Sequence, residues 1–133
     1  MEPWLSAQWT KPNMEKQILA KASFVRMSPR KLRLIAAAVK PLSIDLAIAQ
    51  LKILRKRAGS VLLKVLQQAV GNAKNNLKLS PADLKIKSIL VGEGPRYKRS
   101  DRHSHGARFD SGIRHKRNSH VTVILENKHG TQS

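Results

Sequence analysis

Residues 84–126 have the sequence LKIKSILVGEGPRYKRSDRHSHGARFDSGIRHKRNSHVTVILE. The two ends of this stretch, LKIKSILVGEGP (84–95) and HVTVILE (120–126), are rich in Ile, Val and Leu, which is typical of strands. Between them, residues 96–117 contain eight Lys and Arg, three His and two Asp, with no apolar alternation. A structureless loop of that length is unusual in a compact domain. The pattern therefore predicts that both strands continue past the body of the protein as a long β-hairpin.

We call this predicted hairpin, at about residues 93–119, the arm. About 12 residues in each strand, at ~3.3 Å per residue, give it a length of ~40 Å. The segment HGARFDSG (105–112) contains two glycines and is the expected bend. Gly92, Gly94 and Pro95 predict a bulge or a bend in the first of these strands. Without an apolar alternation that could be buried, we expect the arm to become ordered only when a partner holds it.

The first half of the chain predicts one strand and three amphipathic helices. ILAKASFVR (18–26) has strand character, and Ser28-Pro29 is a favoured helix start. Apolar residues then recur at helical spacing in three segments, the first ending at Pro41, the second starting after Ser43 and the third spanning about 57–77. The sequence thus predicts an α+β fold in which three helices pack on a small three-stranded antiparallel sheet, with a long protruding β-hairpin.

Length and composition fit a single domain, with 133 residues and 41% hydrophobic content. We expect it to span residues 18–126, with an N-terminal extension at 1–17 and a disordered tail at 127–133. The extension has the features of neither a secretory signal nor a transit peptide. Its Trp4 and Trp9 are expected either to bind a partner or to pack on the protein itself.

The charge indicates the class of partner. The chain has 26 Lys and Arg against 8 Asp and Glu, for a net charge of +18. Such self-repulsion opposes compaction, and a polyanion would neutralise it, most commonly a nucleic acid. Cysteine is absent, which excludes disulfides and thiol nucleophiles. Aromatic residues make up only 4%, which argues against a stacking platform for single strands. No apolar run approaches the ~20 residues of a membrane span, so no membrane partner is expected.

The basic residues form three clusters. The first surrounds the predicted start of the first helix, where the helix dipole disfavours cations unless an anion binds there. The second lies in the predicted C-terminal turn of the second helix and has an alternative explanation, because cations favour the negative end of a helix. The third is the arm. The clusters are Arg26, Arg30, Lys31 and Arg33; Lys52, Arg55, Lys56 and Arg57; and Arg96, Lys98, Arg99, Arg102, Arg108, Arg114, Lys116 and Arg117.

Catalysis and metal binding have little support in the sequence. There is no HExxH, paired-carboxylate or phosphate-loop motif. His103 and His105 form an isolated H-x-H pair, which we expect to contact RNA or solvent rather than a metal. No cofactor is expected. Tyr97 and Phe109, the aromatic residues of the arm, are expected either to stack on bases or to pack across the hairpin.

Five motifs in order resemble a known family. They are R-x-SPRKLRL (26–34), KRA (56–58), A-x-x-NA-x-x-N (69–76), V-x-EGP-x-x-KR (91–99) and KR-x-SH-x-TV (116–123). Together they resemble the bacterial type of the universal large-subunit ribosomal protein twenty-two family, over about residues 20–125. This resemblance implies a structural protein without enzymatic activity that binds rRNA at the subunit surface, aids assembly and places its hairpin tip in the nascent-peptide exit tunnel.

The resemblance and the charge clusters together give a set of expected site residues. The expected RNA-binding residues are Arg26, Ser28, Arg30, Lys31, Arg33, Lys56, Arg57, Arg96, Lys98, Arg99, Arg102, Arg108, Arg114, Lys116, Arg117 and His120. The expected tunnel-lining tip is His103, His105, Gly106, Ala107, Arg108 and Phe109.

The resemblance also implies the partners. They are large-subunit rRNA, neighbouring large-subunit proteins including universal protein four, and the nascent polypeptide; no homo-oligomer is expected. The expected location is a bacterial cytoplasmic ribosome, with an organelle ribosome as second choice. A basic architectural protein that binds nucleic acid outside the ribosome is the alternative function.

Overall fold

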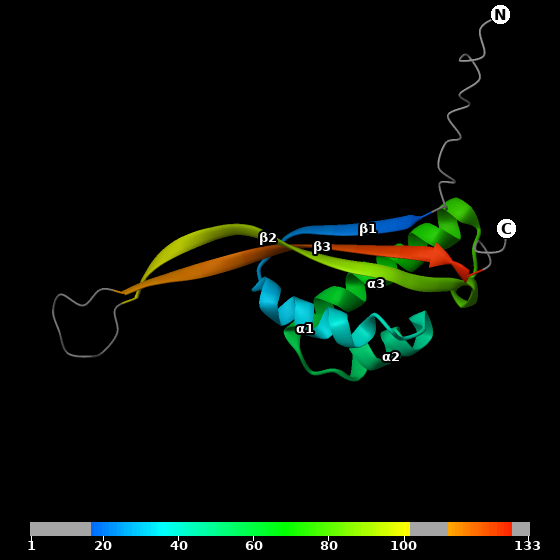
Figure 1. The fold of residues 1–133 in the computed structure, drawn as a ribbon, viewed down its shortest axis with the longest axis horizontal. Coiled ribbons are helices and arrows are strands. Elements are labelled where there is room, and N and C mark those ends of the chain that lie inside the picture. The colour runs from blue at the N-terminus through cyan, green and yellow to red at the C-terminus, as the bar shows by residue number, and fades with distance from the viewer. Residues whose placement is uncertain (1–16, 102–111, 129–133) are drawn as a thin grey trace, which may run out of the picture.

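The computed structural model describes residues 17–101 and 112–128. In chain order its elements are β1 (Ile18–Val25), α1 (Pro29–Val39), α2 (Ile44–Ile53), α3 (Arg57–Leu77), a short 3-10 turn η1 (Pro81–Asp83), β2 (Leu84–Asp101) and β3 (Gly112–Asn127). The helices lie on one side of the sheet, and β2 and β3 extend well beyond them (Figure 1). The predicted α+β class, with three helices and three antiparallel strands in these ranges, is confirmed.

β3 is the central strand of a sheet with the order β1-β3-β2, and both of its pairings are antiparallel. Ile18 lies opposite Leu125, which in turn lies opposite Ile86. Val121 and Val123 alternate with less buried neighbours along β3, which is the pattern of a strand with one face on a core. The last strand of the predicted domain thus lies between its first and its second strand.

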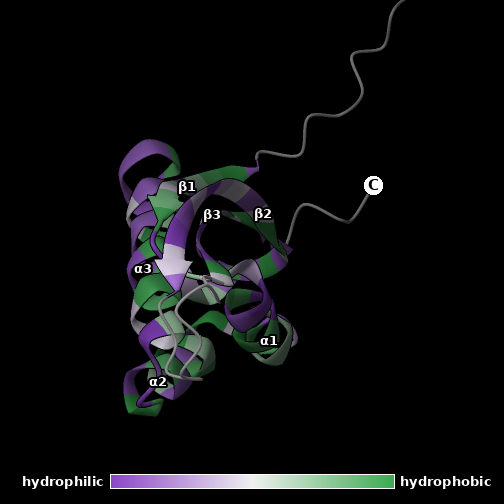
Figure 2. Cartoon of the chain, turned by 90° about the vertical axis from the view of Figure 1, so that its left-hand side faces the viewer, coloured by the Kyte–Doolittle hydropathy of each residue, from purple (hydrophilic) through white to green (hydrophobic). Residues whose placement is uncertain are grey.

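The core lies between this sheet face and the apolar stripes of the helices. Leu32, Leu62 and Leu66 are almost fully buried, and burying such a side chain contributes about 1.5–3 kcal/mol. Hydrophilic and hydrophobic stretches alternate along the helices, as expected for amphipathic helices around a shared core (Figure 2). The buried helical residues at the predicted spacing are Leu32, Ala36, Val39, Ile44, Ala47, Leu51, Leu62, Val65, Leu66, Ala69 and Ala73.

The helix starts agree with the sequence but are built differently in detail. Ser28 and Ser43 occupy the N-cap positions of α1 and α2 with extended backbone, yet neither hydroxyl makes a capping hydrogen bond. Pro29 at the first position of α1 lacks an N–H, which leaves one donor fewer to satisfy there. The positive end of α1 therefore has no side-chain acceptor from its own cap.

The arm continues the β2–β3 pairing as a two-stranded ribbon. Pairing extends from Arg96 opposite Arg117 to Asp101 opposite Gly112, and residues 95–100 and 112–117 are all exposed. The register shifts between Glu93 and Arg96, at the place where the sequence predicted a bulge or a bend; we refer to this shift as the bulge. The segment expected to form the bend, 105–112, lies outside the described residues except for Gly112.

One boundary differs from the sequence prediction. Asn127, which we placed in the tail, is the last residue of β3. Beyond it, the Lys128 Nζ donates a hydrogen bond of 2.6 Å to the carbonyl oxygen of Ala82. The sheet thus extends one residue past the predicted end of the domain because backbone pairing with Leu84 holds Asn127.

Candidate nucleic-acid interface

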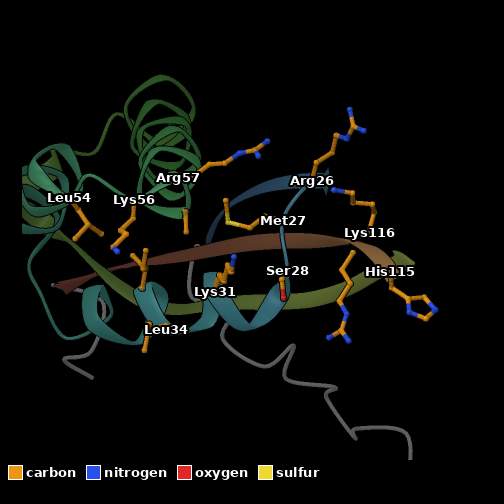
Figure 3. Close-up of a pocket in the computed structure, with 13 residues that line it drawn as sticks. Arg26, Met27, Ser28, Lys31, Leu34, Leu54, Lys56, Arg57, His115 and Lys116 are labelled. Atoms are coloured by element: carbon orange, nitrogen blue, oxygen red, sulfur yellow. The ribbon is translucent and has the colours of Figure 1, made fainter. Parts of the chain in front are cut away.

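An open cavity of about 840 Å³ lies where the start of α1, the start of α3 and the base of the arm meet (Figure 3). Its side chains are of two kinds, basic ones and apolar ones, together with Ser28. No Asp or Glu lines it in the part of the chain that the structure describes. The basic side chains are Arg26, Lys31, Lys56, Arg57, His115, Lys116 and Arg117; the apolar ones are Met27, Leu34, Ile35, Leu54 and Ala58.

The cavity brings together parts of all three basic clusters. Its lining comes from segments 26–35, 54–58 and 115–117, which are far apart in the sequence. Seven of the expected RNA-binding residues line it, including Ser28. Neither the convergence of these clusters nor the contributions of His115 and the apolar residues were predicted from the sequence. No local signal marks such convergence, because only the packing of α1, α3 and β3 creates it.

The second cluster lies elsewhere than expected. We predicted that the last turn of α2 includes Arg55, Lys56 and Arg57, but α2 ends at Ile53. The backbone N–H of Leu54 bonds back to Gln50, and Leu54 itself is extended, so the helix stops there. Only Lys52 is in the last turn, and Arg57 is instead the first residue of α3. The C-terminal capping explanation is therefore wrong for Lys56 and Arg57.

Two helix N-termini with nearby cations face this region. Lys56 is the N-cap of α3, which has no acidic residue in its first turn and no side-chain cap. α1 likewise has no acidic residue in its first turn, and Lys31 lies in that turn. Cations at the positive end of a helix dipole are unfavourable by themselves, whereas an anion bound there interacts favourably with both. The electrostatics of the cavity therefore match a bound polyanion.

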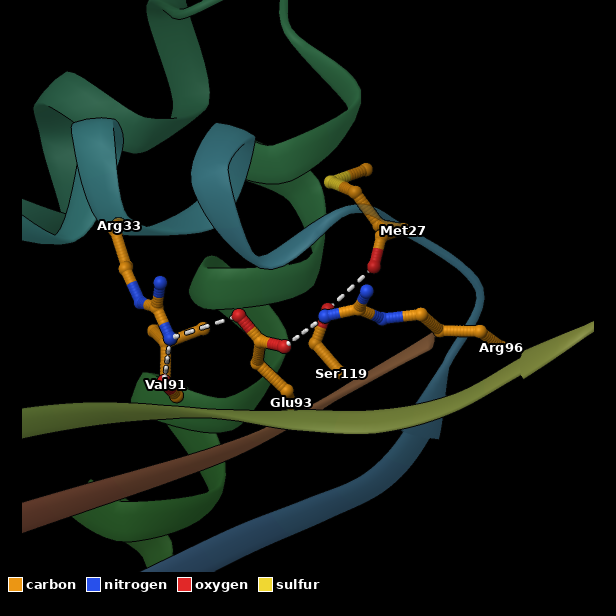
Figure 4. Close-up of polar contacts among 6 residues, drawn as sticks. All are labelled: Met27, Arg33, Val91, Glu93, Arg96 and Ser119. Atoms are coloured by element: carbon orange, nitrogen blue, oxygen red, sulfur yellow. Dashed lines mark hydrogen bonds and ion pairs between the residues drawn. The ribbon is translucent and has the colours of Figure 1, made fainter. Parts of the chain in front are cut away.

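Arg33 belongs to the first cluster but does not line the cavity. Its Nη2 donates a hydrogen bond of 3.2 Å to the carbonyl of Val91 and lies 3.8 Å from Glu93 Oε1 (Figure 4). Arg96 Nη2 lies 2.7 Å from Glu93 Oε2. The hydrogen bond and charge of Arg96, with the charge of Arg33 in addition, hold the pKa of Glu93 below its usual range. These contacts join α1 to the base of the arm, so part of the charge of both arginines is neutralised within the protein.

A buried serine holds the turn that carries Arg26 and Ser28. Ser119, on β3, has 0% of its surface exposed, and its hydroxyl donates a hydrogen bond to the carbonyl oxygen of Met27 (Figure 4). Met27 N–H in turn donates to the carbonyl of Val25 at 2.7 Å. The turn between β1 and α1 is thus fixed to the central strand, at the edge of the cavity.

His120 takes part in a contact within the fold. Its Nδ1 accepts a hydrogen bond of 3.2 Å from the Phe24 N–H, and the two rings meet edge to face at 4.8 Å. Phe24 has φ 54°, which is rare for a residue with a Cβ. The imidazole accordingly stabilises an irregular end of β1. His120 is also an expected RNA-binding residue, and only the edge of its ring away from Nδ1 remains for a ligand.

The arm places like charges opposite each other. Arg96 faces Arg117, and Arg99 faces Arg114 across the ribbon. Directly opposed like charges destabilise a strand pair. Asp101, which forms an ion pair with Arg114, offsets part of this repulsion. The exposed part of the arm therefore has a charge arrangement that an external anion would stabilise.

The remaining expected residues are divided between those that the structure describes and those that it does not. Lys98 faces His115, and Tyr97 faces Lys116 with 48% of its surface exposed. Arg30 is exposed in the first turn of α1. Seven expected residues lie outside the described residues: Arg102, His103, His105, Gly106, Ala107, Arg108 and Phe109.

Within 17–101 and 112–128, no three His, Asp or Glu side chains are grouped as a metal site. In the same residues, no helix has the length and apolar character needed to span a membrane.

Comparison with known proteins decides the family. The family described as Ribosomal protein L22p/L17e matches residues 20–126, which include the cavity and the arm. This chain belongs to that family. The resemblance drawn from the five motifs is confirmed, and so is the expectation that the protein is structural and not an enzyme.

Several bacterial proteins are similar over most of their length. Each is named large ribosomal subunit protein uL22. That of Mycoplasma capricolum is 39% identical over 109 residues, covering 82% of this chain and 96% of its own. That of Thermomicrobium roseum is 37% identical over 110 residues, covering 83% and 91%. That of Lawsonia intracellularis is 40% identical over 112 residues, covering 84% and 96%. The similarity to this family therefore covers both the body and the arm.

Proposed function

We propose that this chain is a structural protein of the large ribosomal subunit, and that its body binds rRNA through the cavity at the start of α1 and α3. The observation that carries the proposal is the convergence of Arg26, Lys31, Lys56, Arg57 and Lys116 on one cavity that no carboxylate of residues 17–101 and 112–128 lines. Phosphates are the natural ligands of such a surface. Family membership and a net charge of +18 support the same conclusion.

The arm has a second role in this proposal. It extends from the body into the rRNA, and its tip, residues 103 and 105–109, lines the nascent-peptide exit tunnel beside universal protein four. The exposed, like-charged ribbon supports this role, because surrounding phosphates would relieve the repulsion between Arg96 and Arg117. A-form RNA is recognised mainly through shape and phosphate contacts, which a ribbon of arginines provides.

The relatives named above are bacterial, which agrees with a cytoplasmic ribosome of a bacterium rather than an organelle ribosome. Family membership also favours the ribosomal role over a basic architectural protein that acts elsewhere.

The experiment compares two variants with the same change of charge. In one, Lys31, Lys56 and Arg57 are replaced by Gln; in the matched control, the exposed Lys40, Lys64 and Lys74 are replaced by Gln. None of the control residues lines the cavity. The affinity of the full chain for purified large-subunit rRNA is measured between 50 and 200 mM salt.

The wild-type chain should bind with a steep salt dependence, about 10³-fold or more over this range if it makes six or more phosphate contacts. The cavity variant should lose about ten- to a hundredfold in affinity and flatten the log–log slope by two to three units. The control should change the affinity much less. A flat salt response of the wild type, or an equal loss in both variants, would contradict the proposal.

A further inference from the structure

The cavity has an apolar part that phosphate binding does not use. Met27, Leu54 and Ala58 line it between the cations, and Leu34 exposes 75% of its surface there. A site for phosphates alone needs donors and positive charge, and an exposed Leu contributes neither. Lys64 and Lys74 on α3 are also exposed, but neither lines this cavity.

The two kinds of lining fit one kind of ligand. A nucleotide that is not stacked in a helix presents a flat, largely apolar base and, next to it, an anionic phosphate. Proteins recognise RNA most specifically through such unstacked nucleotides. The volume of about 840 Å³ lies within the ~300–1,000 Å³ of ordinary small-ligand sites, so a base with its sugar and phosphates fits. Among the described residues no carboxylate lines the cavity, so none of its described side chains repels the phosphates.

We propose that the cavity binds one unstacked nucleotide of the rRNA, with its base against Leu34 and Leu54 and its phosphates on Lys31, Lys56 and Lys116. The inference rests on the proposed function, since it names the part of the RNA that this surface takes. It differs from a surface that follows the duplex backbone, because the base itself leaves the stack and enters the cavity.

The first test replaces an apolar contact without changing the charge. Leu34→Gln removes the apolar side chain from the cavity, and Leu46→Gln is the matched control, since Leu46 is 61% exposed on α2 and does not line the cavity. Both side chains are exposed, so both variants should fold; circular dichroism and thermal melting verify this. Affinity for large-subunit rRNA is then measured across the same salt range.

Leu34→Gln should bind about five- to tenfold more weakly than the wild type, and Leu46→Gln should bind like the wild type. The salt slope should stay unchanged in both, because an apolar contact releases no counterions. If the wild type shows the steep slope but Leu34→Gln binds as tightly as the wild type, the nucleotide inference fails while the proposed function stands. If the wild type shows no steep slope, the proposed function itself fails.

The second test identifies what touches the cavity. Photo-leucine placed at position 34 is crosslinked in the complex with large-subunit rRNA, and the crosslinked product is digested and analysed by mass spectrometry. The expected product joins position 34 to the base of an unpaired nucleotide. A crosslink only to the sugar and phosphates of paired nucleotides, or to a protein segment in assembled subunits, would overturn the inference.

Discussion

The body and the arm share two strands, yet different forces hold them. In the body, β2 and β3 alternate buried and exposed residues and lie against the helices, with Leu84 and Leu125 almost fully buried. In the arm the same strands keep their backbone pairing but expose both faces, and arginines face each other. The body is thus stabilised by its own apolar surface, whereas the described part of the arm is held by backbone hydrogen bonds and exposed ion pairs such as that of Asp101 with Arg114.

The difference shows how the chain divides its work. A segment that buries no apolar surface gains little favourable free energy from folding. It still loses conformational entropy when it becomes ordered. Such a segment is useful when a partner supplies the missing interactions, and the unbalanced positive charge of the arm specifies an anionic one. The border between the regions is sharp. Asn118 and Ser119 are buried, and Arg117 beside them is exposed.

The strongest test of the comparison is a core truncation in the body. Leu66→Ala should lower the free energy of unfolding by about 2–5 kcal/mol, because Leu66 is 1% exposed and its loss leaves a cavity. Tyr97→Ala in the arm should change it by less than about 0.5 kcal/mol, since Tyr97 packs on no core. Urea denaturation of both variants measures this. Similar losses for the two would mean that the arm contributes to the stability of the body.

A smaller effect is expected where the turn before α1 meets β3. Ser119→Ala removes the donor that satisfies the buried Met27 carbonyl, and the cost should be about 1–3 kcal/mol. Because this hydrogen bond holds the turn with Arg26 and Ser28, rRNA affinity should fall as well. Urea denaturation and rRNA binding are measured on the same variant. An unchanged stability would show that the turn is held by other contacts.

The bulge between body and arm offers a matched pair of glycines. A Cβ on Gly94 would lie 3.1 Å from the backbone carbonyl carbon and oxygen of Asn118, whereas a Cβ on Gly92 would meet nothing closer than 3.8 Å. Gly94→Ala should therefore destabilise the protein by about 1–3 kcal/mol, because backbone atoms must shift. Gly92→Ala should be close to neutral. Thermal unfolding compares them, and equal midpoints would contradict the close approach of the strands at the bulge.

The smallest expected effect concerns pH. The folded state lowers the pKa of Glu93 through Arg96 and Arg33, so the ionised carboxylate contributes stability above its unfolded pKa. That contribution is lost as the pH falls through the lowered folded pKa. The difference in melting temperature between wild type and Glu93→Gln should be small at pH 7, persist to about pH 5 and vanish below about pH 3. A difference that grows on acidification would have the wrong sign.

Much of the fold follows from sequence because its signals are local. The stripe Leu62, Val65, Leu66 and Ala69 fixes α3, and the Ile- and Val-rich ends of 84–126 fix β2 and β3. The end of α2 did not follow, because Lys52, Arg55 and Lys56 form a basic run that looks the same in a last helical turn as in a linker. Only the extended backbone of Leu54 separates the two cases.

The charged residues of the site could be predicted from the sequence, but their convergence at one position in the fold could not. The composition of the clusters indicated phosphate binding, yet Lys31, Lys56 and Lys116 meet only through the packing of α1, α3 and β3. The contact of Arg33 with Glu93 likewise depends on the packing of α1 on β2, and the contact of Arg96 with Glu93 depends on the bulge. Sequence alone gives no means of separating the cations that such contacts partly neutralise from those that line the cavity.

Amide hydrogen exchange tests the central claim most directly, that the body is folded by its own core while the arm depends on RNA. In the free protein, amides of 62–73 in α3 should exchange slowly, near the limit set by global unfolding. Amides of 96–101 and 112–117 should exchange fast, because the ribbon opens locally without exposing a core. On binding large-subunit rRNA, protection of the arm should rise at least a hundredfold while that of α3 stays similar. Slow exchange in the arm of the free protein, or no gain on binding rRNA, would contradict the account.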